Sequence, residues 1–145
     1  MDPISATPRA GATEIWEIYN TTVDAHPIHI HLVEFKVLGH QPMDQHLLNL
    51  GKVAPDQHVK ERGPEAGETG FTDTVVAIPG EVTRVQAKFV KDGLYMWHCH
   101  ILEHEDHEMM VPFCSGNAYD PVRGQCKAPD AGSTVPSVSA LPGLR

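Results

Sequence analysis

The segment from His98 to Met109 concentrates side chains that bind transition metals. His98, Cys99 and His100 are consecutive, His104 comes four residues after His100, and Met109 comes five residues after His104. One thiolate, two imidazoles and a weakly held methionine form the ligand set of blue-copper electron-transfer sites. Cys99, His104 and Met109 provide three of these four ligands. The segment therefore predicts a copper site that needs one more histidine.

The residues before this motif have the pattern of a β-strand. Residues 93–97 are short and aromatic, and a turn-forming sequence precedes them, as is typical of a strand. Because side chains alternate between the two faces of a strand, His98 and His100 are expected to point one way and Cys99 the other. The three residues are therefore predicted to serve two different metal sites, joined through the backbone of Cys99.

A second histidine motif lies upstream, at His26, His29 and His31. The apolar run over residues 28–38 predicts one buried strand, on which His29 and His31 share a face. His26 lies at an odd offset from His29, and Pro27 interrupts regular pairing between them, so His26 can face the other way. Both motifs thus divide by strand period into the same two sets. These sets are His26 with Cys99, and His29 and His31 with His98 and His100.

Zinc binding and a purely structural role compete with copper binding as interpretations of these residues. Zinc binds histidine and cysteine too, but it prefers closed tetrahedral sets that gain nothing from Met109. A purely structural role does not account for seven of the ten histidines lying in two short segments. Strand period predicts Met110 to be a core residue. The other histidines are expected to face solvent: His40, His46, His58 and His107.

Composition and charge limit the function classes. The chain has 145 residues, enough for one domain with a real core. Its net charge of −8 argues against nucleic acid or an anionic membrane as a partner. No apolar run is long enough to cross a bilayer, and residues 1–11 lack the basic and apolar regions of a signal peptide.

The remaining pattern predicts strands and almost no helix. Residues 73–78 and 82–90 are expected to form a hairpin or adjacent antiparallel strands. The long connection over residues 39–70 is expected to be functional or mobile. A helical turn over residues 101–107 would bring His104 back toward Cys99. The other predicted elements are strands over residues 13–20, 28–38, 93–98 and 109–113 and a helical turn over residues 47–50.

These elements predict an all-β fold, a Greek-key β-sandwich, over residues 1–126. Residues 127–145 are rich in Pro, Ser, Ala and Gly and are expected to be a disordered or extended tail. Cys114 and Cys126 flank a turn-rich loop and could close a disulfide worth about 3 kcal/mol. Two reduced cysteines are the alternative, because spacing alone does not show pairing.

The two motifs, HPIHIH and HCHILEHEDHEMM, resemble the C-terminal copper motifs of the multicopper oxidases. The sequence of the second motif, and the sequence TEIWEIYN before the first motif, are most similar to those of bacterial laccases of the spore-coat type. The resemblance covers about residues 2–113 and implies a cupredoxin-like sandwich that begins after the first strands of that fold. Missing strands would leave an unpaired sheet edge, so we expect a partner that covers it.

The resemblance also implies a role for each ligand. It places a type 1 copper at His26, Cys99, His104 and axial Met109, a complete site. It makes His29 a ligand of the type 2 copper, and His31, His98 and His100 ligands of the type 3 coppers. These four histidines are only part of the ligand set of a trinuclear cluster. In this family, electrons from a reducing substrate pass from the type 1 copper to that cluster, where O2 becomes water.

Two carboxylates are candidates for supporting roles. The resemblance places an acidic residue at Glu105 near the oxygen-reducing cluster, where it would deliver protons. The alternative is an ordinary solvated carboxylate within the acidic run from Glu103 to Glu108. Asp73 is a lesser candidate for a partner that orients a ligand histidine.

A laccase of this kind has three cupredoxin domains, and half of its cluster histidines come from two His-x-His motifs in the N-terminal domain. No pair among the remaining histidines forms that motif. The expected partner is therefore the N-terminal portion of the oxidase, with self-association as the alternative. The expected small molecules are an aromatic donor and O2. A periplasmic, secreted or spore-coat-like location is favoured over the cytoplasm.

Two functions from different classes follow. The first is the C-terminal part of a laccase-type oxidase that takes single electrons from phenolic or similar donors. The second is a non-catalytic, cupredoxin-like copper protein that carries only the type 1 site. Both proteins would show the intense blue colour of copper bound to a thiolate. Only the first would consume O2 with a phenol, once the missing histidines are supplied.

Overall fold

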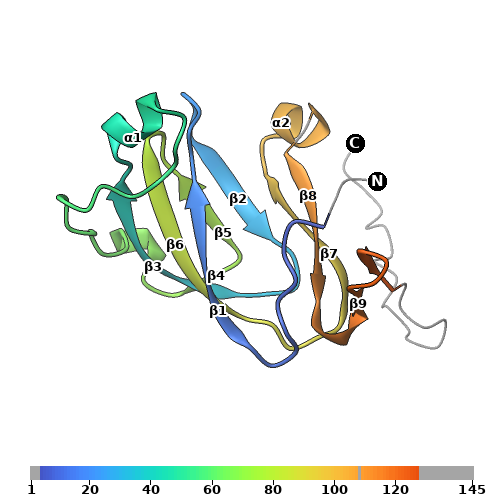
Figure 1. Cartoon of the computed structure of the whole chain (residues 1–145). Coiled ribbons are helices and arrows are strands. Elements are labelled where there is room, and N and C mark those ends of the chain that lie inside the picture. The colour runs from blue at the N-terminus through green and yellow to red at the C-terminus, as the bar shows by residue number, and fades with distance from the viewer. Residues whose placement is uncertain (1–3, 108, 128–145) are drawn as a thin grey trace, which may run out of the picture.

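The computed structural model describes residues 4–107 and 109–127, without the side chains of residues 106 and 107. Its main body is two four-stranded sheets that face each other, as Figure 1 shows. The all-β prediction is confirmed. The first sheet has the order β1 (Thr13–Tyr19), β6 (Glu81–Lys88), β3 (Phe35–Pro42) and β4 (Phe71–Thr72). The second has the order β5 (Thr74–Ala77), β2 (His26–Ile30), β7 (Gly93–Cys99) and β8 (Met110–Ser115).

The smaller elements lie around these sheets. A short pair of strands follows β8, and two helical turns interrupt the longer connections, close to where the sequence predicts them. These elements are α1 (Gln45–Asn49), α2 (Leu102–His107), β9 (Tyr119–Asp120), β10 (Gln125–Cys126) and the 3-10 turns Ala66–Glu68 and Gly116–Ala118. The predicted tail covers residues 127–145, of which residues 128–145 lie outside the described part of the chain. Within the described part of the chain, none of the helices has the length and apolar character to span a bilayer.

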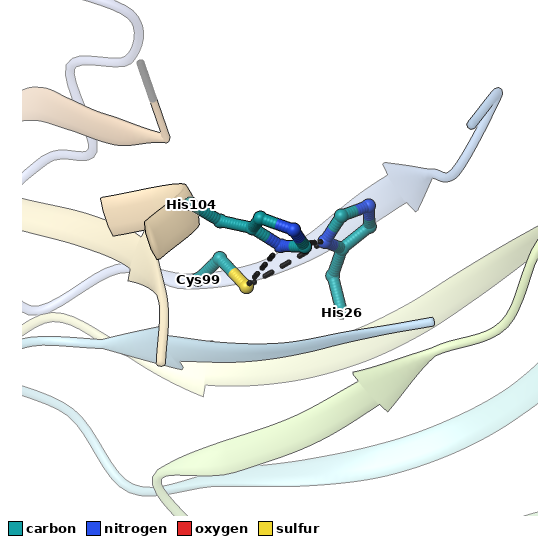
Figure 2. A group of neighbouring side chains, drawn as sticks. All are labelled: His26, Cys99 and His104. Carbon is teal, nitrogen blue, oxygen red and sulfur yellow. Dashed lines mark hydrogen bonds between the residues drawn. The ribbon is translucent and has the colours of Figure 1, made fainter. Parts of the chain in front are cut away.

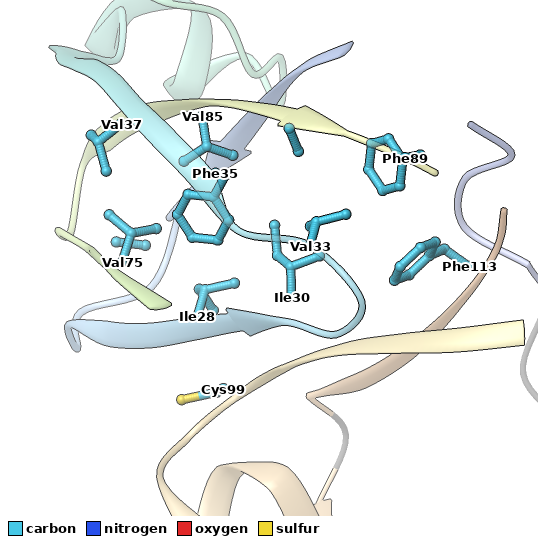
Figure 3. Packing of buried hydrophobic residues seen from close by; sticks show 12 residues of the cluster. Ile28, Ile30, Val33, Phe35, Val37, Val75, Val85, Phe89, Cys99 and Phe113 are labelled. Carbon is cyan, nitrogen blue, oxygen red and sulfur yellow. The ribbon is translucent and has the colours of Figure 1, made fainter. Parts of the chain in front are cut away.

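The core lies between the two sheets and is built by strand alternation. In β2, residues at positions 26, 28 and 30 are buried while those between them are only partly so. Phe35 on β3 and Phe113 on β8 are fully buried and pack with Ile28 and Ile30 in one cluster. Figure 3 shows that Cys99 on β7 borders this cluster on the side of β2. The cysteine is therefore held in apolar surroundings.

The predicted single strand over residues 28–38 is wrong. The chain turns after β2, where Leu32 has a positive φ of 79°, and then enters β3 in the other sheet. Apolar residues continue through the turn, since Val33 is buried like Ile30 and Phe35. The sequence therefore reads as one strand although it crosses between sheets.

The predicted pairing of residues 73–78 with 82–90 is also wrong. Both strands exist, as β5 and β6, but β5 pairs with β2 and β6 pairs with β1 and β3. The turn at Ile78–Glu81, closed by a hydrogen bond from Glu81 N–H to Ile78 O, carries the chain from one sheet to the other. Such crossings at consecutive strands are what close the two sheets into a sandwich.

The long connection after Gly39 is packed against the first sheet rather than free. The strand β3 continues to Pro42, and His40 forms a bridge with Arg62 across the connection. A Cβ at Gly39 would collide with the main-chain oxygen of Arg62, so glycine permits this close approach. Arg84 on β6 also binds Glu61 of the connection. The connection is thus held at several points.

His40 was expected to face solvent, and this prediction is wrong. Its side chain is fully buried, with Nδ1 3.1 Å from Thr83 Oγ1 and Nε2 2.9 Å from Glu68 Oε2. Burial alone raises the pKa of Glu68, but hydrogen bonds from His40 and from the Glu65 backbone outweigh it, and the pKa lies below 4.5. His46 and His58 are exposed, as predicted. The side chain of His107 lies outside the described residues.

Cys114 and Cys126 form a disulfide, with Cα atoms 5.6 Å apart. The bond ties buried Cys114 on β8 to β10. Of the two alternatives left open by the sequence, the structure has the paired form. Among the described residues Cys99 is the free cysteine, and it is buried.

Candidate metal centres

The pairing of β2 with β7 brings the two histidine motifs together. In this antiparallel pair Ile28 lies opposite Cys99, and His29 lies opposite His98. Residues opposite each other share a face, so Cys99 faces the interior with Ile28 while His98 and His29 lie on the other face. Cys99 and His98 therefore face opposite sides of β7, as the strand period predicts. Pro27 does not interrupt the strand, because the pairing of β2 with β5 runs through it.

The first centre consists of His26, Cys99 and His104. Figure 2 shows the two imidazole rings converging on the sulfur. The Nδ1 atoms of His26 and His104 lie 3.5 Å and 3.7 Å from Cys99 Sγ, and 3.2 Å from each other. Cys99 is fully buried and His26 is 5% exposed. Three ligand atoms of the predicted types therefore meet in a site where Cys99 and His26 are buried and His104 is partly exposed.

The dimensions of this triangle fit a metal ion. An ion at its centre would lie about 2 Å from each corner, close to metal–nitrogen and metal–sulfur bond lengths of about 2.0 to 2.3 Å. A trigonal set of two imidazoles and one thiolate is the donor set of blue-copper centres. The types and the spacing of these donor atoms therefore fit a copper ion.

The turn after β7 places His104. The helix α2 begins at Leu102, and His104 N–H donates to Ile101 O at 3.0 Å. This turn reverses the chain within five residues of Cys99, so His104 can return to the sulfur. The predicted helical turn over residues 101–107 is confirmed.

Met109 returns to the same place from the other end of α2. Its N–H donates to His104 O, and its own carbonyl accepts from Cys99 N–H, both at 3.1 Å. The side chain is partly buried and packs against the core cluster. Met110, which was expected in the core, is instead 37% exposed. The backbone thus holds Met109 beside the first centre, while coordination by its sulfur stays a prediction.

The second centre lies on the opposite side of β7. The ligand nitrogens of His29, His31 and His98 lie within 4.8 Å of one another, and His31 Nε2 is 3.1 Å from His98 Nε2. His100 lies outside this group but next to it, with its ring centroid 5.5 Å from that of His98 and 5.8 Å from that of His29. All four histidines predicted for one site are therefore neighbours.

Main-chain carbonyls orient two of these rings. His29 Nδ1 lies 2.9 Å from Asp73 O, and His98 Nδ1 lies 3.1 Å from Cys99 O. A carbonyl can only accept, so Nδ1 of each neutral ring carries the hydrogen and Nε2 is left for a metal. Asp73 was a candidate for orienting a histidine, and it contacts His29 through its backbone. Its carboxylate lies 3.8 Å from the same nitrogen.

The surroundings of His31 favour its neutral form. Burial lowers the pKa of His31 below 6.5, and the neighbouring His29 and His98 lower it further. The carboxylate of Glu105 acts on the pKa of His31 in the opposite direction. Neutral histidine is the metal-binding form. Glu105 is half-buried on α2 and lies close enough to His31 for this interaction.

One contact to a candidate ligand was not found from the sequence. Thr22, in the turn between β1 and β2, lies with Oγ1 2.7 Å from His26 Nε2. The sequence marked this stretch only as a turn. The only sequence feature that could have indicated this contact is a hydroxyl side chain four residues before a histidine. That spacing is too common to identify the contact by itself.

Comparison with known proteins supports the sequence resemblance. Residues 1–118 match the multicopper oxidase family. A laccase from Bacillus subtilis (strain 168) is 45% identical over 116 residues, which cover 77% of this chain and 22% of that protein. A laccase from Haloferax volcanii is 44% identical over 111 residues, which cover 76% of this chain and 16% of that protein.

Solved structures give the same result. A laccase from Pediococcus acidilactici has a TM-score of 0.62 and 32% identity, over 79% of this chain and 22% of that chain. A multicopper oxidase from Campylobacter jejuni, titled a metallo-oxidase, has a TM-score of 0.62 and 29% identity, over 78% of this chain and 20% of that chain. The sandwich therefore has the predicted cupredoxin-like fold.

The chain spans about a fifth of the length of these relatives. The match to the family nevertheless covers most of this chain, and copper is the metal that the family name implies. The two groups of histidine and cysteine are the places where such a metal could bind. The chain belongs to the multicopper oxidase family.

Proposed function

We propose that this chain is the C-terminal copper-binding part of a laccase-type multicopper oxidase. In this proposal residues 1–126 form the domain and residues 127–145 a tail. Copper, when bound, supplies one-electron oxidation of a phenolic or similar aromatic donor at the first centre and reduction of O2 to water at the second. The observation that carries the proposal is the pair of ligand sets on opposite faces of β7, joined at Cys99.

The first centre is assigned as type 1, with His26, Cys99 and His104 as ligands and Met109 as the axial ligand. These residues do two things. They hold one sulfur and two imidazole nitrogens in a triangle before any metal enters. They also keep water away from the sulfur, because Cys99 is fully buried.

The second centre is assigned as this chain's share of a trinuclear cluster. His29 is the type 2 ligand, and the type 3 ligands are His31, His98 and His100. Cys99 is bonded directly to His98 and His100, so the covalent path between the two centres is one residue long. Glu105 is proposed to hold and pass protons beside His31, on which its charge acts.

A partner is proposed to complete the second centre. Of the remaining histidines whose side chains the structure describes, His40 is hydrogen-bonded to Thr83 and Glu68, and His46 and His58 are exposed on the connection after β3. They are not placed to complete the cluster. The chain also spans only about a fifth of its relatives. The proposed partner is the N-terminal portion of the oxidase, and self-association is the alternative.

The location proposed is periplasmic, secreted or spore-coat-like rather than cytoplasmic. The observation that supports it is the disulfide between Cys114 and Cys126. Disulfides form and persist in oxidising compartments and are rare in the cytosol.

A second candidate function is a non-catalytic copper protein with only the type 1 centre. The observation that favours it is that this chain supplies a complete ligand set for the first centre but not for the second. The first has its ligands within this chain, whereas the second offers four histidines. Such a protein would accept and release electrons without reducing O2.

The deciding experiment measures copper content, visible absorption and O2 uptake with a phenol. The chain is tested alone and after mixing with an N-terminal portion that carries the two His-x-His motifs. We expect the chain alone to be blue without O2 uptake, and the co-purified mixture to gain copper and consume O2. The control is Cys99→Ser, which should abolish both the blue colour and O2 uptake. A blue, co-purified mixture without O2 uptake supports the second candidate, and a colourless chain contradicts both.

A further inference from the structure

The turn between β1 and β2 binds the nitrogen of His26 that faces away from the first centre. Thr22 Oγ1 lies 2.7 Å from His26 Nε2, while His26 Nδ1 lies 3.5 Å from Cys99 Sγ. The imidazole of His26 is thus held between the turn and the sulfur. Which of its two nitrogens carries the hydrogen decides whether Nδ1 can bind a metal.

Asn20 fixes the direction of the hydrogen bonds in this turn. Its side chain is 4% exposed, and Nδ2 donates to Asp24 O at 2.7 Å and to Ala77 O at 2.9 Å. Both partners are carbonyls, which only accept, so the amide cannot be reversed without losing both bonds. Asn20 Oδ1 is therefore an acceptor at a known position.

Thr22 donates its single hydroxyl hydrogen to a carbonyl oxygen. Its Oγ1 lies 2.7 Å from Asn20 Oδ1, which also accepts from Thr22 N–H at 2.9 Å. The other oxygen within reach is Asp24 O at 3.2 Å, again an acceptor. Whether the hydroxyl hydrogen points to Asn20 Oδ1 or to Asp24 O, none is left to donate to His26. Thr22 Oγ1 can therefore only accept a hydrogen bond from His26. The hydrogen of the neutral ring must then be on Nε2.

We infer that Asn20 and Thr22 are positioning residues that hold His26 in its Nε2–H tautomer. In this state the lone pair of Nδ1 points toward Cys99 and is ready for a metal. The inference rests on the proposed function for the identity of the metal as a type 1 copper. The tautomer itself follows from the hydrogen bonds and does not depend on copper.

The two centres select opposite tautomers by the same means. At His29 and His98 a carbonyl binds Nδ1 and leaves Nε2 free. At His26 the hydroxyl of Thr22, whose own hydrogen is donated to Asn20 or Asp24, accepts from Nε2 and leaves Nδ1 without a hydrogen. A partner that orients a ligand imidazole also raises its basicity toward the metal. Thr22 therefore does for the first centre what the carbonyls do for the second.

The first test determines the tautomer of His26 in the unaltered, metal-free chain. Two-bond nitrogen–proton correlation spectra distinguish the two forms at about pH 8, above the ordinary histidine pKa of about 6.5. We expect the Nε2–H form. An Nδ1–H form would overturn the inference whether or not the chain binds copper, so this outcome is independent of the proposed function.

The second test uses Thr22→Val, which keeps the shape but removes the hydroxyl. We expect a mixture of tautomers and copper binding at the first centre weaker by roughly 10- to 100-fold. Thr22→Ser should restore both values, and Thr21→Val, at the exposed neighbouring position, should change neither. An Nε2–H ring and full affinity in Thr22→Val would contradict the inference. If Thr22→Val does not fold, the inference is still tested by the copper affinity and tautomer of Thr22→Ser and by the tautomer of the unaltered chain.

Discussion

His29 and His98 lie opposite each other in the antiparallel pairing of β2 and β7, with ring centroids 5.3 Å apart. The next pair along the strands is Ile28 and Cys99. One register therefore places a histidine pair on one face and the cysteine on the other. Because a slip of one residue would exchange the two faces, the same pairing that buries Ile28 also sorts the ligands. Strand pairing in the core therefore brings together the side chains of both candidate metal centres.

Met109 and Met110 should respond differently to the same substitution. We expect Met109→Leu to raise the reduction potential of the first centre, because loss of a weak axial sulfur ligand favours the reduced metal. Met110→Leu is the matched control, since Met110 is 37% exposed and lies outside the core cluster. The measurement is a redox titration followed by the blue absorption. Equal shifts in both variants, or none, would show that Met109 is not the axial ligand.

The disulfide between Cys114 and Cys126 should stabilise the domain. The two residues are 12 positions apart, and closing a loop of about this length is worth about 3 kcal/mol. Cys126→Ala should therefore lower the free energy of unfolding by about 2 to 3 kcal/mol, measured in urea without reductant. In the presence of reductant the variant and the unaltered chain should become nearly equal. A difference that persists unchanged under reduction would rule out the disulfide as its cause.

Glu68 should stabilise the connection after β3 in a pH-dependent way. Glu68→Ala leaves buried His40 without the partner at 2.9 Å, which costs about 1 to 3 kcal/mol in unfolding free energy near neutral pH. The pKa of Glu68 is depressed on folding from 4.5, so its contribution is fully present above 4.5 and is lost as pH falls through the lower folded value. Urea unfolding at several pH values checks this. Glu34→Ala, on the turn between β2 and β3, is the control and should have little effect at any pH.

The placement of His98 and Cys99 on opposite faces could be predicted from sequence because it depends only on the period of a strand. His98 and Cys99 must face opposite sides whatever sheet they join, whereas His31 and His100 lie just beyond the ends of β2 and β7. The chain's path between sheets could not be predicted in the same way. Leu32 turns the chain with a positive φ, a conformation usually marked by glycine or asparagine, and here no such residue signals it.

The burial of His40 depends on a residue far away in sequence. Glu68, its partner, is 28 positions downstream, on a connection whose path the local pattern does not define. The same limit applies to Thr22 and His26, which are close in sequence but bonded only because the turn between them is fixed by Asn20. The period of a strand predicts which face of a sheet a side chain lies on. Contacts such as these can be predicted only when the three-dimensional path of the loops is known.

Glu105 should matter for oxygen reduction and not for donor oxidation. It lies half-buried on α2, directly after His104, and its charge acts on His31 of the second centre. Reduction of O2 to water consumes protons, and a positioned carboxyl group typically contributes about 10²- to 10⁴-fold to a proton-transfer step. In the assembled oxidase, Glu105→Gln should therefore slow O2 uptake by at least about 10²-fold while reduction of the first centre by a phenol keeps its rate.

The matched control for this prediction is Glu103→Gln, an exposed carboxylate on the same helix. Both substitutions remove one negative charge near α2, so a general electrostatic effect would slow both variants alike. A specific proton path predicts a large loss only for Glu105→Gln, and a loss that depends on pH. O2 uptake that is unchanged across pH in Glu105→Gln would remove the carboxylate from the mechanism, and protons would then have to reach the second centre from the partner side.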